Sequence, residues 1–226
     1  EYLETRGITP NILSKYGAGY SSSMFTALTE LGSQKGYDMA AMEKAGLITR
    51  KENGKIFDRF VNRITFPFYS LSGLVIGFTG RSLEKDTQCK YLNSPETPLF
   101  HKGKTLFGIY QARQEISKSD KCYLVEGQFD VLSFVQSGYP NTVCGSGTAL
   151  TLDQVRIIKK FTRNVTAVYD GDAAGMKASV RNMDIMLAEG MNVRAVLLPE
   201  GEDPDSFARK MGTEKLAKFL KKQETD

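Results

Sequence analysis

Short apolar runs alternate with helix-length segments in the second half of the chain. The runs are rich in β-branched and apolar residues and predict buried parallel strands at 122–125, 165–169 and 193–198. The intervening stretches predict helices at 129–137, 152–161 and 173–189. A strand that alternates with a helix is typical of a doubly wound α/β sheet with helices on its flanks.

The first half of the chain has a different, mixed α/β pattern. Helical spacing occurs at 11–16, 24–31 and 39–45, and strands are predicted at 63–68 and 74–78 with a hairpin turn at 70–73. A polar stretch at 117–120 predicts a boundary between two domains, residues 1–117 and residues 118–226. Apolar residues at helical spacing among lysines predict an amphipathic surface helix at 213–223.

Acidic residues follow the predicted strands of the second half. Glu126 comes directly after the strand at 122–125, and Asp170 directly after the strand at 165–169. In such sheets ligands bind beyond the carboxyl ends of the strands. Four further carboxylates lie in the same short motifs or in the following GEDPD segment: Asp130, Asp172, Asp203 and Asp205. Carboxylates gathered at one edge repel one another unless a divalent cation neutralises them, so the six predict a metal site.

Each acidic motif also has a purely structural interpretation. Asp172 and Asp205 can be helix N-caps, and Glu126 can be an ordinary surface residue. The position of all three motifs at strand ends favours the metal site.

Basic residues are concentrated before the predicted acidic sheet. The chain has a net charge of +4, and residues 50–113 carry eleven Lys or Arg against five Asp or Glu. The basic zone holds Arg59, Arg63, Arg81, Lys85, Lys90, Lys102 and Lys104, interleaved with Tyr91, Asn93 and Phe100. Cations pair with phosphates and aromatic rings stack on bases, so this zone predicts binding of single-stranded nucleic acid or nucleotides. The small excess of charge also fits an ordinary solvated face.

Composition excludes several other classes of protein. The hydrophobic content of 41% and charged content of 25% are ordinary for a globular protein of 226 residues. No apolar run approaches the length of a membrane span and no signal segment opens the chain, so we expect a cytoplasmic protein without a membrane partner. Three cysteines without CxxC spacing and a single histidine, His101, argue against a structural zinc site or a disulfide framework.

The motifs VEGQFD, YDGDAAG and LLPEGEDPD, in this order, resemble those of the Toprim fold. The flanking segments DRFVNRITFPF, GLVIGFTGRSL, KYLNSPETPLFHKGKTLFGIYQAR and GSGTALT are similar to the RNA-polymerase core of DnaG-type bacterial primases. The resemblance covers nearly the whole chain. It implies a mixed α/β N-terminal subdomain followed by a Toprim-like parallel sheet, without the zinc-binding and helicase-binding domains of a full primase.

The resemblance also implies an activity and its partners. The expected reaction is synthesis of short RNA primers from NTPs on a single-stranded DNA template, by nucleotidyl transfer that depends on Mg²⁺, for which Mn²⁺ can substitute. The expected partners are the DNA template, the NTPs, the RNA–DNA hybrid and, through a domain outside this chain, the replicative helicase.

Residue roles follow from the same resemblance. Glu126 is the candidate acid/base residue or ligand, Asp170 and Asp172 are the central metal ligands, and Asp130, Asp203 and Asp205 complete the acidic ring. The expected contacts to nucleic acid or nucleotide are Arg6, Arg63, Arg81, Lys90, Tyr91, Asn93 and Lys102. Arg63 can instead pair with a nearby acid. Gly145, Gly147 and Thr148 can offer backbone N–H groups to an anion or simply form a tight turn.

Two other classes of function stay open from the sequence. One is a Toprim nuclease or topoisomerase-like enzyme, which would act on DNA without NTPs. The other is a non-catalytic DNA-binding module, which would bind DNA in a salt-dependent way without incorporating nucleotides.

Overall fold

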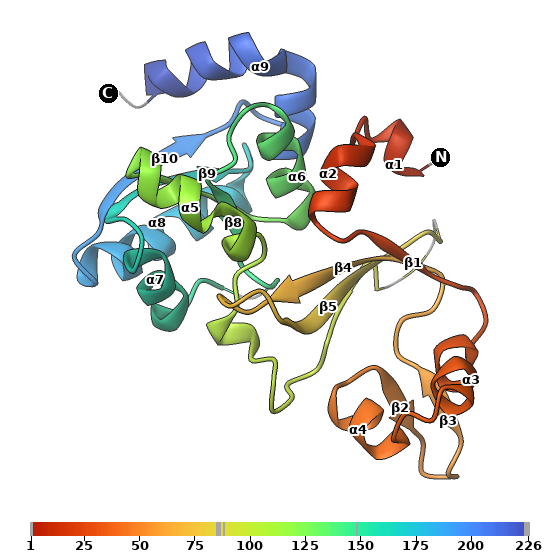
Figure 1. Ribbon diagram of the computed structural model, residues 1–226. Coiled ribbons are helices and arrows are strands. Elements are labelled where there is room, and N and C mark those ends of the chain that lie inside the picture. The colour runs from red at the N-terminus through yellow and green to blue at the C-terminus, as the bar shows by residue number, and fades with distance from the viewer. Residues whose placement is uncertain (1, 85–86, 88, 148, 224–226) are drawn as a thin grey trace. The chain divides into compact units, whose positions relative to one another are not determined.

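The computed structural model describes residues 2–84, 87, 89–147 and 149–223, except for the side chain of residue 174 (Figure 1). The chain forms two compact units. One unit, here called the sheet-helix unit, contains the chain up to residue 13 and from residue 102 onward. The other, the hairpin unit, contains residues 14–101.

The hairpin unit is built on an antiparallel sheet. Its strand order is β1-β4-β5-β6, with bounds β1 Gly19–Ser21, β4 Arg63–Tyr69, β5 Val75–Ser82 and β6 Tyr91–Asn93. A second pair, β2 Ile48–Arg50 with β3 Ile56–Asp58, lies beside helices α3 Ala27–Gln34 and α4 Met39–Lys44. The rings of Phe68 and Phe100 pack 4.9 Å apart between centroids in the core of the unit. The antiparallel pairing of β4 with β5 confirms the predicted hairpin at 63–78.

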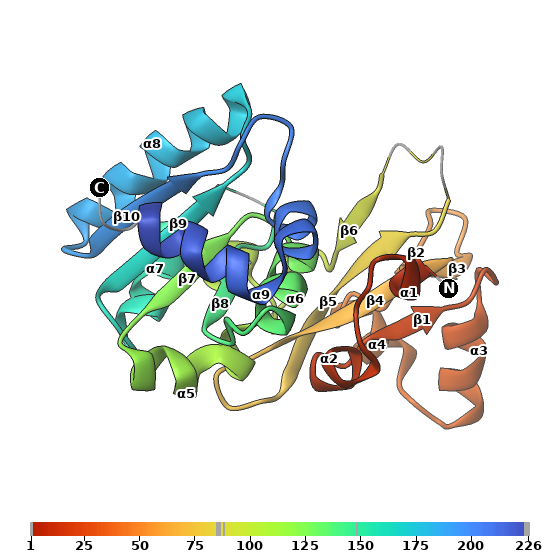
Figure 2. The same cartoon turned by 90° about the horizontal axis from the view of Figure 1, so that it is seen from above.

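The sheet-helix unit contains a parallel sheet of order β10-β9-β7-β8 (Figure 2). The strands are β7 Cys122–Val125, β8 Thr142–Cys144, β9 Asn164–Tyr169 and β10 Asn192–Leu197. The helices are α1 Tyr2–Thr5, α5 Ile109–Ser119, α6 Gln128–Gln136, α7 Leu152–Lys159, α8 Ala173–Ala188 and α9 Pro204–Gln223, with a 3₁₀ turn at Lys102–Lys104. Helix α2 Pro10–Lys15 crosses from this unit into the other.

The order of the strands creates a switch point between β7 and β9. From β7 the chain moves outward to β8, and it then returns to pair β9 on the opposite side of β7. Because such crossovers are right-handed, α6 covers one face of the sheet and α7 and α8 cover the other. Figure 1 shows α9 and α8 on opposite sides of the sheet. A crevice for ligands is expected where the strand order reverses, outside the ends of β7 and β9.

Most predicted elements are confirmed, with two corrections. The strand predicted at 193–198 as buried is β10, an edge strand in which only Val196 is buried. Burial fails there because β10 has a neighbour on one side only. The tail helix predicted at 213–223 is the second part of α9, which starts at Pro204 and is interrupted by Gly212 in a left-handed conformation. Leu216 and Leu220 are buried along it, as the amphipathic pattern predicts.

The polar segment at 117–120 does not separate the compact units. It forms the last turn and cap of α5, and Ile109, Ala112 and Ile116 on that helix are buried within the sheet-helix unit. The polarity of this segment therefore reflects a solvated helix end. Among the described residues, no helix has both the length and the apolar character that crossing a bilayer requires.

Candidate functional site

Glu126 and Asp170 lie at the switch point of the parallel sheet. Each is the first residue after its strand, and the register pairs Leu124 of β7 with Ala167 of β9. The backbone N–H of Asp170 lies near the Glu126 carboxylate and favours its charged form. The structure thus confirms that these two carboxylates converge where the sheet leaves room for a ligand.

Asp170 sits in an unfavourable place for a negative charge. Its Oδ1 atom is buried and has no hydrogen-bond partner within the part of the chain that the structure describes. Burial, followed by repulsion from Glu126, Asp203 and Asp172, raises the pKa of Asp170 to about 6. Partial burial likewise raises the pKa of Glu126, with a smaller contribution from Asp172, against the opposing effect of the Asp170 N–H. These shifts identify Glu126, Asp170, Asp172 and Asp203 as one electrostatically coupled group.

Glycine brings the two aspartates of the DGD motif against the loop that carries Asp203. The N–H of Gly171 donates to the carbonyl of Glu202 at 3.1 Å. A Cβ atom at Gly171 would lie 2.1 Å from the carbonyl oxygen of Pro199, so a side chain has no room there. Asp172 then caps α8, its Oδ1 accepting the N–H of Gly175 at 2.7 Å. The N-cap interpretation of Asp172 is therefore confirmed, and its second oxygen accepts no hydrogen bond from the residues that the structure describes.

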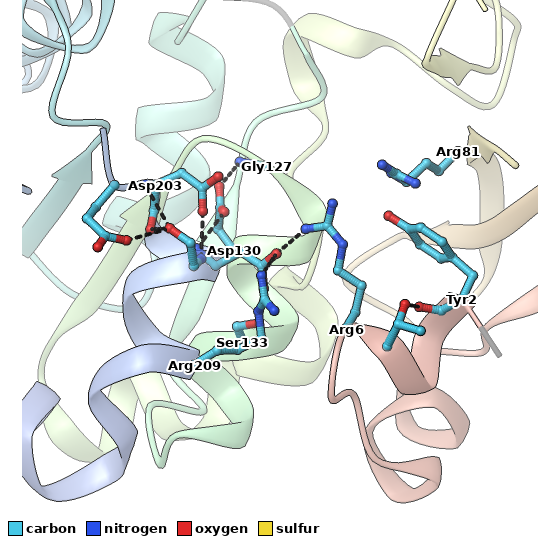
Figure 3. Close-up of polar contacts among 12 residues, drawn as sticks. Tyr2, Arg6, Arg81, Gly127, Asp130, Ser133, Asp203 and Arg209 are labelled. Atoms are coloured by element: carbon cyan, nitrogen blue, oxygen red, sulfur yellow. Dashed lines mark hydrogen bonds and ion pairs between the residues drawn. The ribbon is translucent and has the colours of Figure 1, made fainter. Parts of the chain in front are cut away.

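Asp130 is held behind this group at the start of α6 (Figure 3). Its Oδ2 accepts the N–H of Gly127 at 2.7 Å, and its Oδ1 accepts the N–H of Asp205 at 3.1 Å. Burial raises the pKa of Asp130 well above its usual range, and repulsion from Asp203, Asp170 and Asp205 adds to this. Asp130 thus connects α6 to the start of α9 through backbone hydrogen bonds.

Asp205 has a different environment from the one predicted. The residue is 2% exposed, and its carboxylate accepts hydrogen bonds from the hydroxyl of Ser133 at 2.6 Å and from Nε of Arg209 at 2.9 Å. Arg6 also donates to it, and the two groups form an ion pair (Figure 3). The carboxylate is neutralised by two arginines, so its role as a metal ligand stays a prediction. The i, i+4 spacing of Asp205 and Arg209 was a signal for one of these partners that the sequence analysis missed.

The predicted metal site is only partly assembled. Asp203 caps the start of α9, its Oδ1 accepting the N–H of Ser206 at 2.6 Å. Within the described ranges, no three acidic, histidine or cysteine side chains form a ready-made metal cage. Mg²⁺, however, binds through one or two carboxylates and retains several waters. The partnerless buried oxygen of Asp170 and the coupled carboxylates around it fit such an all-oxygen site.

The predicted nucleic-acid contacts differ in availability. Lys90 and Tyr91 are exposed, at 44% for Tyr91, and Nε of Arg81 donates to the Tyr91 hydroxyl at 3.2 Å. Arg63 donates to backbone carbonyls of Gly80, Cys89 and Lys90 at 3.0 to 3.3 Å, and among the described residues it pairs with no acid.

The backbone carbonyls of two other predicted contacts, Asn93 and Lys102, accept hydrogen bonds within the protein. The carbonyl of Asn93 accepts hydrogen bonds from both Nε and Nη2 of Arg59. Burial lowers the pKa of Arg59. The carbonyl of Lys102, in the sheet-helix unit, accepts the side-chain amide of Gln154 at 3.0 Å. Two candidates, Lys85 and Thr148, lie outside the described residues.

Arg6, which the sequence analysis expects to contact nucleic acid, makes several contacts within the protein. Its guanidinium lies 5.5 Å from the ring centre of Phe129 and 5.7 Å from that of Tyr2, in addition to its ion pair with Asp205. These contacts tie the start of the chain to α6 and α9. A structural role is therefore evident for Arg6, and a contact to nucleic acid stays a prediction.

Comparison with known protein families matches two consecutive segments of the chain. Residues 1–113 match the family described as "DNA primase catalytic core, N-terminal domain", and residues 123–208 match the family described as "Toprim-like". The chain belongs to the DNA primase catalytic core family. The predicted division at residues 117–118 falls between the two matched segments and stays a prediction, since the compact units divide elsewhere.

Individual primases show the same relationship. A DNA primase of Halalkalibacterium halodurans is 39% identical over 218 residues, which cover 96% of this chain and 36% of that protein. The chain therefore spans about a third of the length of the curated relatives it matches. A crystal structure of a DNA primase domain from Pseudomonas aeruginosa superposes with a TM-score of 0.91 at 38% identity, covering 98% of this chain and 70% of that one. A DnaG primase catalytic domain bound to single-stranded DNA has a TM-score of 0.89 at 35% identity, over 98% of this chain and 71% of that one.

Proposed function

We propose that this primase core synthesises short RNA primers from NTPs on single-stranded DNA, by metal-dependent nucleotidyl transfer. The observation that carries the proposal is the coupled group of Glu126, Asp170, Asp172 and Asp203 at the switch point of a Toprim-like sheet. In this proposal, residues 1–117 bind nucleic acid and nucleotide, and residues 118–226 bind the metal. The template-bound relative supports single-stranded DNA as the partner.

The reaction joins the 3′ oxygen of one nucleotide to the α-phosphorus of the next and releases pyrophosphate. Bound Mg²⁺, or Mn²⁺ in its place, would supply positive charge to the phosphoryl oxygens and lower the pKa of the attacking hydroxyl. Asp170 and Asp172 are the proposed central ligands, because the first carries a buried oxygen without a described partner and the second has an oxygen with no hydrogen bond to any described residue.

Glu126 is the proposed acceptor of the hydroxyl proton. Partial burial raises its pKa, and a base is most effective when its pKa is near the working pH. Lys90 and Tyr91 are the proposed contacts to template or triphosphate in the hairpin unit, because both side chains are exposed. The RNA–DNA hybrid and a replicative helicase are the further proposed partners at a cytoplasmic replication fork, the helicase through a region outside this chain.

The test is incorporation of labelled NTPs on a defined single-stranded template with Mg²⁺. The wild-type chain should form dinucleotides or short RNA, and Asp170→Ala should abolish incorporation while retaining the circular-dichroism spectrum of the fold. Asp184→Ala, an exposed carboxylate on α8, is the matched control and should retain activity. Full activity of Asp170→Ala would refute the metal role. Metal-dependent DNA cleavage without NTPs would instead favour a nuclease.

A further inference from the structure

A cavity of about 340 Å³ opens beside Glu126 on the α8 side of the sheet. Its walls include Gly145, Gly147 and Leu150 from the loop that precedes α7, and Arg181 and Asn182 from α8. The volume lies within the range of about 300–1,000 Å³ that is usual for small-molecule sites. The cavity thus adjoins the carboxylate group, and its walls contain groups that the proposed roles above leave unused.

Arg181 is the main cationic group of this cavity. Its side chain is exposed and, within the described part of the chain, it forms neither a hydrogen bond nor an ion pair. Two other arginines of the sheet-helix unit, by contrast, form ion pairs: Arg209 with Asp205 and Arg156 with Glu189. A guanidinium presents a planar fork of donors that matches a phosphate group in two parallel hydrogen bonds. An unpaired guanidinium at a cavity wall is therefore available to an anionic ligand.

The loop on the opposite wall offers further donors. The backbone N–H groups of Gly147 and Leu150 donate no hydrogen bond to any described group. Gly147 has a left-handed backbone, with φ of +77°, and loops of this kind can direct successive N–H groups to a common concave side. The first turn of α7 is not part of this donor set, because Thr151 Oγ1 already accepts the N–H of Gln154 at 3.2 Å.

Tyr169 and Asn182 complete the polar lining. The Tyr169 hydroxyl is buried beside Asn182, and burial raises the pKa of Tyr169 to about 12. The phenol consequently remains protonated at neutral pH. No carboxylate other than Glu126 is among the residues that line the described walls of the cavity.

We propose that this cavity binds the polyphosphate of the nucleotide, first as part of the bound NTP and then as the released pyrophosphate, with Arg181 as its principal contact. The inference rests on the proposed function and extends it, since pyrophosphate is the leaving group of that reaction. Anionic phosphates can approach Glu126 and Asp170 only if cations separate them, and Arg181 supplies positive charge from the α8 side. Arg181 thereby gains a substrate role that none of the sequence motifs indicated.

The experiment is titration calorimetry of the protein with inorganic pyrophosphate in the presence of Mg²⁺. Arg181→Gln should weaken binding about tenfold, which corresponds to about 1.4 kcal/mol, and Arg181→Lys should restore part of the affinity. The matched control is Arg194→Gln, an exposed arginine on β10 that does not line the cavity, and it should bind like the wild type. In the incorporation assay, Arg181→Gln should raise the KM for NTP and the inhibition constant of pyrophosphate by a similar factor.

Four outcomes would overturn the inference. Three are absence of pyrophosphate binding by the wild type, affinity of Arg181→Gln within twofold of the wild type, and equal weakening by Arg194→Gln. A fourth is a loss of affinity for single-stranded DNA in Arg181→Gln with pyrophosphate binding intact, which would assign the arginine to the template. Because calorimetry needs no turnover, a chain that binds pyrophosphate as expected but incorporates no nucleotide would contradict the proposed function and still support this site.

Discussion

Replacing Asp170 with asparagine is expected to stabilise the metal-free protein at neutral pH. The carboxylate occupies a site where burial and three neighbouring carboxylates disfavour its charge, so its pKa is about 6 in place of the ordinary 3.8. At about 1.36 kcal/mol per pKa unit, a difference of about two units corresponds to about 3 kcal/mol. Asp170 is only half-buried, and solvent screening reduces the expected gain to about 1–2 kcal/mol.

The direction of the pH dependence follows from proton binding. Between about pH 4 and about pH 6 the folded protein holds a proton on Asp170 that the unfolded chain releases. The free energy of unfolding of the wild type should therefore fall as the pH rises through this window, and this contribution should stay constant above it. Asp170→Asn should lack this part of the pH dependence, because asparagine does not titrate.

The assay is urea denaturation in the presence of a chelator at about pH 5 and about pH 7.5, with Asp184→Asn as the control for an exposed carboxylate. Added Mg²⁺ should stabilise the wild type and have little effect on Asp170→Asn, since a ligand stabilises only the state that binds it. A variant less stable than the wild type at about pH 7.5 would refute the claim that this carboxylate is held in an unfavourable environment.

Three further changes test the supports of the site. Gly171→Ala should cost about 1–3 kcal/mol of folding stability, measured by denaturation, because a Cβ would collide with the carbonyl of Pro199; unchanged stability would contradict this packing. Asp205→Asn should cost about 1.5–3 kcal/mol and lower Tm by several degrees, since a buried charge-assisted network is lost; a Tm equal to that of the wild type would argue against the network. Lys90→Gln should lower the slope of DNA affinity against salt concentration by about 1, the value for one phosphate contact, without loss of stability. Arg63→Gln should mainly destabilise the hairpin unit, and the opposite pattern would reverse these roles.

Local pattern was sufficient to predict much of the sheet and the convergence at its edge. The strand at 122–125 is short, apolar and followed by an acid, and these properties depend only on neighbouring residues. The strand β8, of only three residues, was missed because so short a run carries little periodic signal. The strand order was also beyond the pattern, since parallel strands pair across long stretches of chain.

The interaction partners of individual charged side chains were harder to predict than the location of the site. Asp205 and Arg6 are 199 residues apart in sequence, and their ion pair arises only because α1 and the start of α9 both lie near α6. The motifs and the family resemblance assigned one to metal and the other to nucleic acid. The three carbonyl partners of Arg63, on Gly80, Cys89 and Lys90, likewise lie 17 to 27 residues away in sequence. Long-range pairing therefore decides which charged groups remain available to ligands.

The central claim is that Asp170 and its coupled carboxylates hold a divalent cation at the switch point of the sheet. Titration of the protein with Mn²⁺, with the free ion followed by electron paramagnetic resonance, tests this most directly. The account predicts that the wild type and Asp184→Asn withdraw Mn²⁺ from solution, and that Asp170→Asn binds it at least about tenfold more weakly, a loss of about 1.4 kcal/mol. Equal Mn²⁺ binding by Asp170→Asn and the wild type would contradict the account.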